Sequence, residues 1–152
     1  MSDLIFVPMT QDYVPMLEEW FEDAELQRRF GGMLPLQNFL DYVQSEPEYF
    51  WWVALDGSAS VGMAFMQIAP GEPQGFGFLV NPALRRQGYG TRILQMLLAR
   101  PEAASVTVWQ AGIEPDNVAS QRCVAALGFA PDGSGPDAEG FVQYVYEAGE
   151  KP

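Results

Sequence analysis

The stretch that decides the fold is residues 75–91, Gly-Phe-Gly-Phe-Leu-Val-Asn-Pro-Ala-Leu-Arg-Arg-Gln-Gly-Tyr-Gly-Thr. Residues 76–80 are apolar and end at the turn signal Asn81-Pro82, which predicts a buried strand. A glycine-rich segment follows and leads into an apolar pattern of helical period. A strand, a glycine loop and a helix start in this order can bind an anion, because free backbone N–H groups and the helix dipole favour negative charge.

The loop between strand and helix carries two glycines and two arginines. We expect Gly88 and Gly90 to let the backbone approach a ligand closely and to adopt φ values that a side chain would forbid. Arg85 and Arg86 add positive charge at the same place. These four residues therefore predict an anion site at residues 85–90.

Two common phosphate-binding motifs do not fit this loop. A dinucleotide fingerprint requires a third glycine where Ile93 stands. A P-loop requires Lys and then Ser or Thr after the glycine, whereas Gly90 is followed by Thr91 and Arg92. The loop is therefore a third kind of anion binder.

The composition limits the class of protein. The 152 residues predict a single domain spanning 1–152, and the lack of a long apolar run or a basic, cleavable N-terminus predicts a cytoplasmic protein without a membrane segment. One cysteine excludes an internal disulfide, and the absence of histidine removes the commonest metal ligand, so we expect no metal. A net charge of −12 disfavours nucleic acid and anionic lipid and suits a cationic partner.

The rest of the chain reads as mixed α/β, an α+β mixed sheet of six to seven strands with about four helices. A helix capped by Thr10 or Asp12 is expected to reach about residue 23, and Asn117 is expected to cap a later helix that Gly128 closes in the left-handed conformation. Expected strands cover residues 4–7, 50–55, 60–68, 76–80, 105–109 and 141–146; the other expected helices end near 30, follow Pro35, and cover 88–100.

Two segments together resemble the GNAT superfamily of N-acetyltransferases. One is Arg85-x-x-Gly88-x-Gly90 after the strand that ends at Val80; the other is residues 116–122, Asp-Asn-Val-Ala-Ser-Gln-Arg, followed by Leu-Gly-Phe at 127–129. The first half more weakly resembles the branch with aminoglycoside N-acetyltransferases, at residues 9–12, 17–21 and 31–32. The resemblance implies a GNAT-like acyl-CoA N-acyltransferase fold in which strands 76–80 and 105–109 splay apart.

The resemblance also implies roles for particular residues. Acetyl-CoA would be the co-substrate, with its pyrophosphate on the loop, its pantetheine arm along the strand, and the backbone N–H of Val80 at the developing oxyanion. An amine would attack the thioester directly. The expected cofactor-binding residues are Leu79, Val80, Arg85, Arg86, Gln87, Gly88, Tyr89, Gly90, Thr91, Asn117 and Ser120.

The sequence departs from the superfamily at the acid and the base. Many members carry a Tyr in the later helix that protonates the thiolate, where Val124 stands here, and a Glu on the central strand, where Gly75 stands. Glu114 or Asp116 could relay the proton through water, and Tyr144, Tyr146 or Tyr89 could serve as acid. Cys123 is interpreted as a small packing residue and not as a nucleophile.

The acceptor side is less specified by the sequence. An acidic run at residues 18–25 is either a solvated helix face or a wall that attracts a cationic amine. Trp51 and Trp52 should point to opposite faces of their strand, one into the core and the other toward the amine. The expected substrate-binding residues are Trp20, Glu22, Asp23 and Trp52.

We therefore predict an N-acetyltransferase that moves acetyl from acetyl-CoA to a primary amine of a small molecule or peptide. The first alternative is a non-catalytic acyl-CoA-binding module, because the usual acid and base are absent. A second is an anion- or nucleotide-binding domain unrelated to CoA. A homodimer is left open as the oligomeric state.

Overall fold

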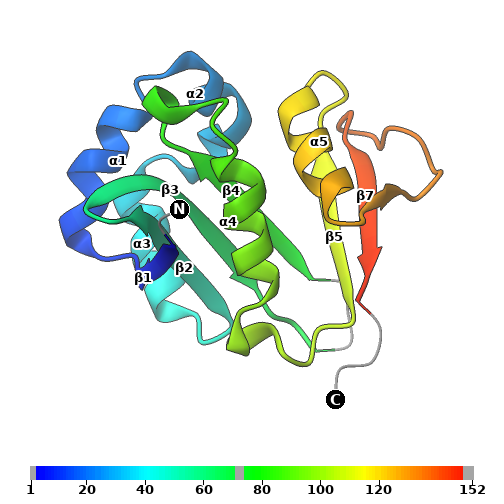
Figure 1. The fold of residues 1–152 in the computed structure, drawn as a ribbon, viewed down its shortest axis with the longest axis horizontal. Helices are drawn as coiled ribbons and strands as arrows, with labels where there is room; N and C mark the ends of the chain where they lie inside the picture. The colour runs from blue at the N-terminus through cyan, green and yellow to red at the C-terminus, as the bar shows by residue number, and fades with distance from the viewer. Residues whose placement is uncertain (1–2, 71–73, 149–152) are drawn as a thin grey trace.

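The computed structural model describes residues 3–70 and 74–148, and shows an α/β arrangement within these ranges (Figure 1). The strands are β1 (Leu4–Pro8), β2 (Tyr49–Asp56), β3 (Ala59–Gln67), β4 (Gly75–Val80), β5 (Val108–Ile113), β6 (Ala130–Pro131) and β7 (Val142–Glu147). The α-helices are α1 (Val14–Trp20), α2 (Ala24–Phe30), α3 (Leu36–Ser45), α4 (Tyr89–Leu98) and α5 (Val118–Ala126). Short 3₁₀ turns cover Gln11–Tyr13, Gly31–Met33, Pro82–Leu84 and Pro101–Ala103.

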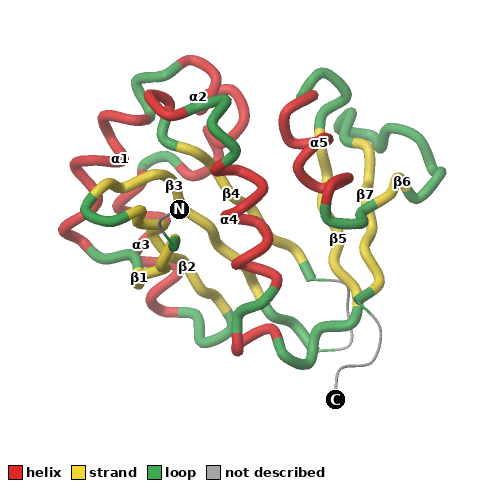
Figure 2. The backbone as a smooth tube through the Cα atoms, viewed as in Figure 1, coloured by secondary structure: helices red, strands yellow, loops and turns green. Residues whose placement is uncertain are grey.

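The strands form two antiparallel sheets that meet at one point. The first has the order β1-β2-β3-β4 and the second β5-β7-β6. They are joined by a parallel bridge between Gln74 and Trp109, where the Gln74 N–H donates to Val108 at 3.0 Å and the Gln110 N–H donates to Gln74 at 3.0 Å. Beyond this bridge β4 and β5 diverge, as Figure 2 shows. The expected splayed pair of strands is confirmed.

The four-stranded sheet separates two hydrophobic cores. Trp51, Val53 and Met63 face the core that α1 and α3 complete, whereas Trp52 and Ala64 face the core that contains α4. Adjacent residues of a strand point to opposite faces, so the two tryptophans enter different cores, as expected. Both are buried, at 4% and 5% exposure, so the expectation that at least one of them lies in the core is confirmed.

Helix α4 is fixed by an apolar stripe. Ile93, Leu94 and Leu97 are completely buried against the sheet, and burial of each such side chain stabilises the fold by about 1.5–3 kcal/mol. Helix α5 contributes Val124 to the same core and lies beside α4 (Figure 1). The two helices stand at the open end of the splay between β4 and β5.

Two boundaries differ from the sequence prediction. The first helix starts at Val14 after a 3₁₀ turn, without a side-chain cap from Thr10, and Asp23 starts a separate helix by accepting a hydrogen bond from the Leu26 N–H at 3.0 Å. The strand expected at 105–109 is β5, Val108–Ile113, because pairing with β7 continues through Gln110, Ala111 and Gly112. These residues lack the apolar signal on which the prediction depended.

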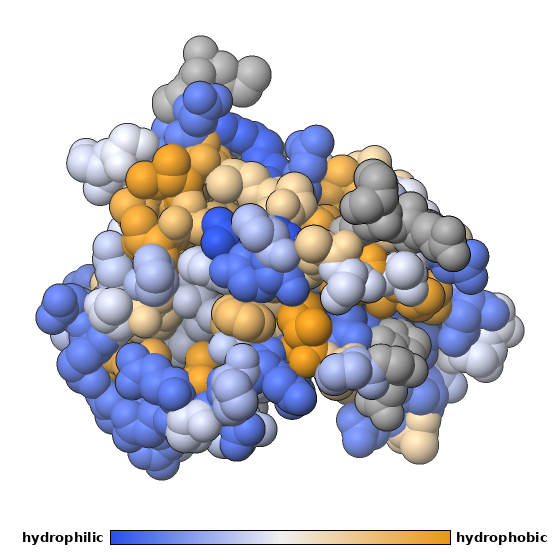
Figure 3. Space-filling view, turned by 90° about the horizontal axis from the view of Figure 1, so that it is seen from below, coloured by the Kyte–Doolittle hydropathy of each residue, from blue (hydrophilic) through white to orange (hydrophobic). Residues whose placement is uncertain are grey.

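The surface mixes polar and apolar residues. On the face seen from below in Figure 3, apolar groups lie between hydrophilic ones and do not form one continuous apolar area. Within 3–70 and 74–148, no helix combines the length and apolar character that a membrane crossing requires.

Candidate active site

The glycine loop begins at a fixed turn. The Asn81 side chain accepts a hydrogen bond from the Ala83 N–H at 3.0 Å and donates to the Ser60 carbonyl at 3.2 Å. The Asn81 N–H also donates to Val61 at 2.8 Å. These bonds attach the end of β4 to β3, so the loop that follows starts from a rigid position.

The loop contains two left-handed residues. Gly88 has φ +83° and directly precedes α4, and Arg86 has φ +66°, the one positive φ among the described residues that are not glycine. A left-handed arginine costs of order 1–3 kcal/mol, and such strain is retained mainly at functional sites. Alternating right- and left-handed residues form backbone concavities that bind anions. Gly88 makes no side-chain cap, so the first N–H groups of α4 are available.

Gly90 serves a different purpose from the one expected. Its φ is not positive, so the expectation that both glycines adopt forbidden φ values holds for Gly88 and is wrong for Gly90. A Cβ on Gly90 would lie 3.1 Å from the Cys123 sulfur. The missing side chain lets α5 pack closely on α4, and the Thr91 hydroxyl donates to the same sulfur at 3.4 Å. Cys123 is half-buried in this contact.

The charges at the loop are partly neutralised. Arg85 donates two hydrogen bonds to Asp23, while Arg86 and Gln87 are exposed. The Tyr89 hydroxyl donates to Asp56 at 2.7 Å, and this bond raises the pKa of the tyrosine. Tyr89 is therefore engaged at the end of β2.

A cavity of about 100 Å³ lies in the splay between β4 and β5. It brings together three of the residues expected at the site, Glu114, Asn117 and Ser120. Asn117 caps α5, as predicted, by accepting a hydrogen bond from the Ser120 N–H at 3.3 Å. The full lining is Arg29, Phe30, Phe76, Gly77, Phe78, Ala111, Gly112, Ile113, Glu114, Asn117, Ser120, Val124 and Phe141.

An ionic cluster closes one side of this cavity. Arg29 lies within 3.1 Å of Glu114, 3.0 Å of Asp116 and 2.8 Å of Glu25, and Arg28 also pairs with Asp116. Burial opposes the charge of Arg29, but hydrogen bonds to the three carboxylates outweigh it and raise its pKa. Hydrogen bonds from Arg29 and Arg28 lower the pKa of Asp116, which makes this carboxylate a weaker base.

The expected acceptor-side residues do not share one surface. Trp20 is buried in the core of α1 and α3, and Trp52 is stacked between Phe6 and Phe50 at centroid distances of 5.8 Å. Glu22 is exposed in the turn after α1. Packing alone accounts for both indole rings, so a substrate-binding role for these residues stays a prediction.

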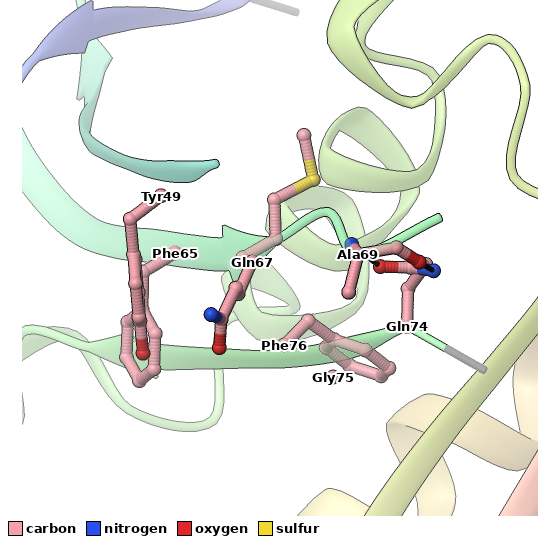
Figure 4. A pocket seen from close by; sticks show the side chains of 8 residues that line it. Tyr49, Phe65, Gln67, Ala69, Gln74, Gly75 and Phe76 are labelled. Carbon is pink, nitrogen blue, oxygen red and sulfur yellow. Dashed lines mark hydrogen bonds between the residues drawn. The ribbon is translucent and has the colours of Figure 1, made fainter. Parts of the chain in front are cut away.

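A second cavity, of about 280 Å³, lies beside the start of β4 (Figure 4). It is lined by Tyr49, Phe65, Met66, Gln67, Ala69, Gln74, Gly75 and Phe76. No sequence pattern indicates this cavity, nor the ion pairs that Arg28 and Arg29 form with Asp116 and Glu114. The arginines stand in the last turn of α2, where a favourable helix-dipole contact already explains them.

Splayed strands beside a glycine loop at a helix N-terminus define an acyltransferase fold, and comparison with known proteins agrees. Residues 3–130 match the family model of the acetyltransferase (GNAT) domain. The chain is 36% identical over 141 residues to an uncharacterized N-acetyltransferase, YfmK, of Bacillus subtilis, which covers 92% of this chain and 94% of that protein. It is 37% identical over 105 residues to a mycothiol acetyltransferase of Thermobifida fusca, covering 69% of this chain and 28% of that protein.

Solved structures share the fold. A domain from Methanocaldococcus jannaschii superposes with a TM-score of 0.80 at 17% identity, covering 97% of this chain and 99% of that one. The aminoglycoside acetyltransferase AAC(6')-Ib, solved with acetyl-CoA, gives 0.75 at 22% identity, covering 95% and 93%. The chain belongs to the GNAT acetyltransferase family and is an acetyl-CoA-dependent N-acetyltransferase.

Proposed function

We propose that this enzyme acetylates a primary amine of a small molecule or peptide by direct attack on acetyl-CoA bound in the splay. The observation that carries the proposal is the left-handed loop at the start of α4, where a Cβ on Gly90 would lie 3.6 Å from Phe78, a residue of the cavity between β4 and β5. The pyrophosphate would accept hydrogen bonds from the backbone of residues 86–91. The loop from Arg85 to Thr91 would surround the pyrophosphate. The exposed Arg86 guanidinium would add positive charge beside it, whereas Arg85 is paired with Asp23.

The strand β4 offers a suitable edge for the pantetheine arm. It pairs with β3 on one side, and past Gln74 no described strand pairs with the other side. Such an edge presents N–H and C=O groups to a ligand. Leu79 is buried toward α1 and α3, so it would contribute backbone contacts only, and the Val80 N–H would stabilise the oxyanion. Asn117 and Ser120 would lie on the opposite side of the arm.

The transfer needs a neutral amine. Aliphatic amines have a pKa of about 10, so most of the acceptor arrives protonated at neutral pH. Its proton would leave to water before the nitrogen attacks. The new C–N bond then forms, the C–S bond breaks, and the nitrogen loses its second proton, which reaches the departing thiolate of CoA directly or through water. Glu114 and Asp116 hold arginines, so a relay through either is a weaker route than solvent.

An acylated cysteine does not fit this geometry. The Cys123 sulfur packs on Gly90 and accepts a hydrogen bond from the Thr91 hydroxyl where α4 and α5 meet. The lining of the cavity in the splay does not include it. Transfer therefore proceeds without a covalent enzyme intermediate.

The second candidate is a non-catalytic acyl-CoA-binding module. The observation that favours it is the occupation of the two usual acid and base positions by Val124 and Gly75. A thiol-release assay with acetyl-CoA against a broad amine panel separates the two. Amine-dependent release of CoA supports the enzyme, whereas tight binding of acetyl-CoA in calorimetry with no release above the uncatalysed rate supports the module.

A further inference from the structure

The cavity at the start of β4 is built from two rows of residues that cross the sheet. In the first row Tyr49 pairs with Gln67, and Gln67 pairs with Gly75. In the second, Trp51 pairs with Phe65 and Phe65 with Gly77. Residues two apart on a strand share a face, so both rows lie on the α1–α3 side. Each row ends in a glycine on β4.

The glycines determine the shape of the cavity. A Cβ on Gly77 would lie 2.3 Å from the Phe65 ring, so this ring lies directly on the backbone of β4. A Cβ on Gly75 would meet nothing within 4 Å. The Phe65 ring thus forms a flat wall, and the open space begins at Gly75. Figure 4 shows Tyr49, Phe65 and Gln67 reaching from β2 and β3 toward β4.

This cavity adjoins the one in the splay. Phe76 lines both cavities, Gly75 lines the first and Gly77 lines the second. The three residues are consecutive on β4. A molecule held against Gly75 therefore lies next to the cavity in the splay, where acetyl-CoA is proposed to bind.

The eight described lining residues are uncharged, and three of them, Tyr49, Phe65 and Phe76, are aromatic. The Phe39 ring supports the wall, with its centroid 5.9 Å from the rings of Tyr49 and Phe65. The polar groups are the Tyr49 hydroxyl and the Gln67 amide. Burial, with the neighbouring Tyr42, raises the pKa of Tyr49, so its hydroxyl keeps its proton. Gln74 is held by hydrogen bonds with Ala69 at 2.5 and 2.6 Å.

The described lining offers a polycation no opposite charge. Of the eight described residues around the cavity, none carries a carboxylate. Glu114, the carboxylate in the described lining of the adjoining cavity, already pairs with Arg29. Moving several ammonium groups into such surroundings costs more than the aromatic contacts return. A flat apolar group with one hydrogen-bonding substituent matches them instead.

We propose that this cavity binds the body of the acceptor, and that the acceptor is a monoamine with a flat apolar group and a single hydrogen-bonding substituent. The proposal rests on the proposed function, because it assigns the acceptor of that reaction. Tyramine is the probe that carries these features, and spermidine and kanamycin represent polycations.

The test measures both binding and turnover. Calorimetry of tyramine with the CoA-saturated protein should show binding, and Gly75→Val should weaken it at least 10-fold because the side chain occupies the cavity without a clash. Tyr49→Phe and Gln67→Leu should each weaken it about 3- to 10-fold through a lost hydrogen bond. The matched control is Gly32→Val, which is also sterically free and lies on the turn before α3.

The outcomes separate the two proposals. Binding of tyramine that Gly75→Val removes supports the acceptor site, even if no amine is acetylated, and absence of turnover with every amine overturns the proposed function alone. Spermidine or kanamycin turning over 10-fold better than tyramine overturns the acceptor site. Unchanged tyramine binding in folded Gly75→Val, or no tyramine binding to the wild type, also overturns it.

Discussion

Arg85 donates two hydrogen bonds to Asp23, from Nη1 to Oδ1 at 3.0 Å and from Nη2 to Oδ2 at 2.5 Å. The pair joins the first residue of the anion loop to the start of α2, where Asp23 is also the N-cap. Two residues expected to serve different ligands, one the cofactor and the other the amine, therefore hold each other. The carboxylate reduces the positive potential that the loop offers to a phosphate.

Asp23→Asn should strengthen acetyl-CoA binding. Asparagine keeps the N-cap of α2 but removes the negative charge beside Arg85. Because the pair is partly exposed, we expect a gain of about 2- to 5-fold, which shrinks as salt is added. Calorimetry at low and high ionic strength measures it, with the exposed Glu19→Gln as control. Weaker binding in Asp23→Asn would mean that the carboxylate positions Arg85 for the phosphate.

The same pair should make stability depend on pH. The hydrogen bond from Arg85 is the largest cause that lowers the pKa of Asp23 below its ordinary value. The Asp23 carboxylate therefore stabilises the folded protein fully above the pKa of the unfolded chain, which is about 3.9. This contribution is lost as the pH falls through the lower pKa of the folded protein. The wild type should melt about 2–4 °C above Asp23→Asn at pH 6, and the difference should shrink as the pH falls below about 4. A melting-temperature difference that grows on acidification would contradict a lowered pKa of Asp23 in the folded protein.

Gly90 and Cys123 should be energetically coupled. Gly90→Ala places a methyl group 3.1 Å from the Cys123 sulfur and should lower the unfolding free energy by about 1 kcal/mol. Cys123→Ala removes the sulfur, so the double variant should be at least about 0.5 kcal/mol more stable than additivity predicts. Denaturant unfolding of the four proteins measures the coupling. Additive changes in the unfolding free energy would show that the methyl group of Gly90→Ala and the Cys123 sulfur do not press on each other.

Cys123→Ala alone should leave turnover within a few-fold, since the thiol packs between α4 and α5. The thiol-release assay with the preferred amine measures this, and Cys123→Ser serves as the conservative control. Detection of an acetylated Cys123 by mass spectrometry during turnover would contradict direct transfer.

The dependence of kcat on pH should show no dedicated base. Because the amine loses its proton to solvent, kcat should climb through pH 8 and 9. Glu114→Gln, Asp116→Asn, Glu22→Gln and Asp23→Asn should each retain activity, since one well-placed base contributes roughly 10²–10⁴-fold. A plateau by pH 7 that disappears in one of these variants would identify a base.

Local patterns predicted the elements whose cause is local. The loop at Gly88, the Asn117 cap and the left-handed Gly128 each depend on a few neighbouring residues, and the structure has all three. The splay followed from a resemblance to known enzymes. The boundaries of β5 did not follow, because Gln110–Gly112 are strand residues only through pairing with β7.

The unpredicted parts of the site depend on distant residues. Arg28 and Asp116 are 88 positions apart, and neither residue type nor spacing indicates that they meet. The cavity beside Gly75 needs Tyr49 and Gln67 in register on β2 and β3. A glycine in a strand indicates close approach or open space only after its neighbours are known.

The most direct test of the account is acetyl-CoA binding by Gly88→Val. Gly88, at φ +83°, and Gly57, at φ +61°, both have open space around a Cβ, so valine strains the backbone at both positions without a clash. Gly57 lies in the turn between β2 and β3, outside the loop. In calorimetry, the wild type and Gly57→Val should bind acetyl-CoA alike, and Gly88→Val should bind at least 10-fold more weakly while remaining folded. Equal affinity in folded Gly88→Val and Gly57→Val would contradict the assignment of the loop to the pyrophosphate.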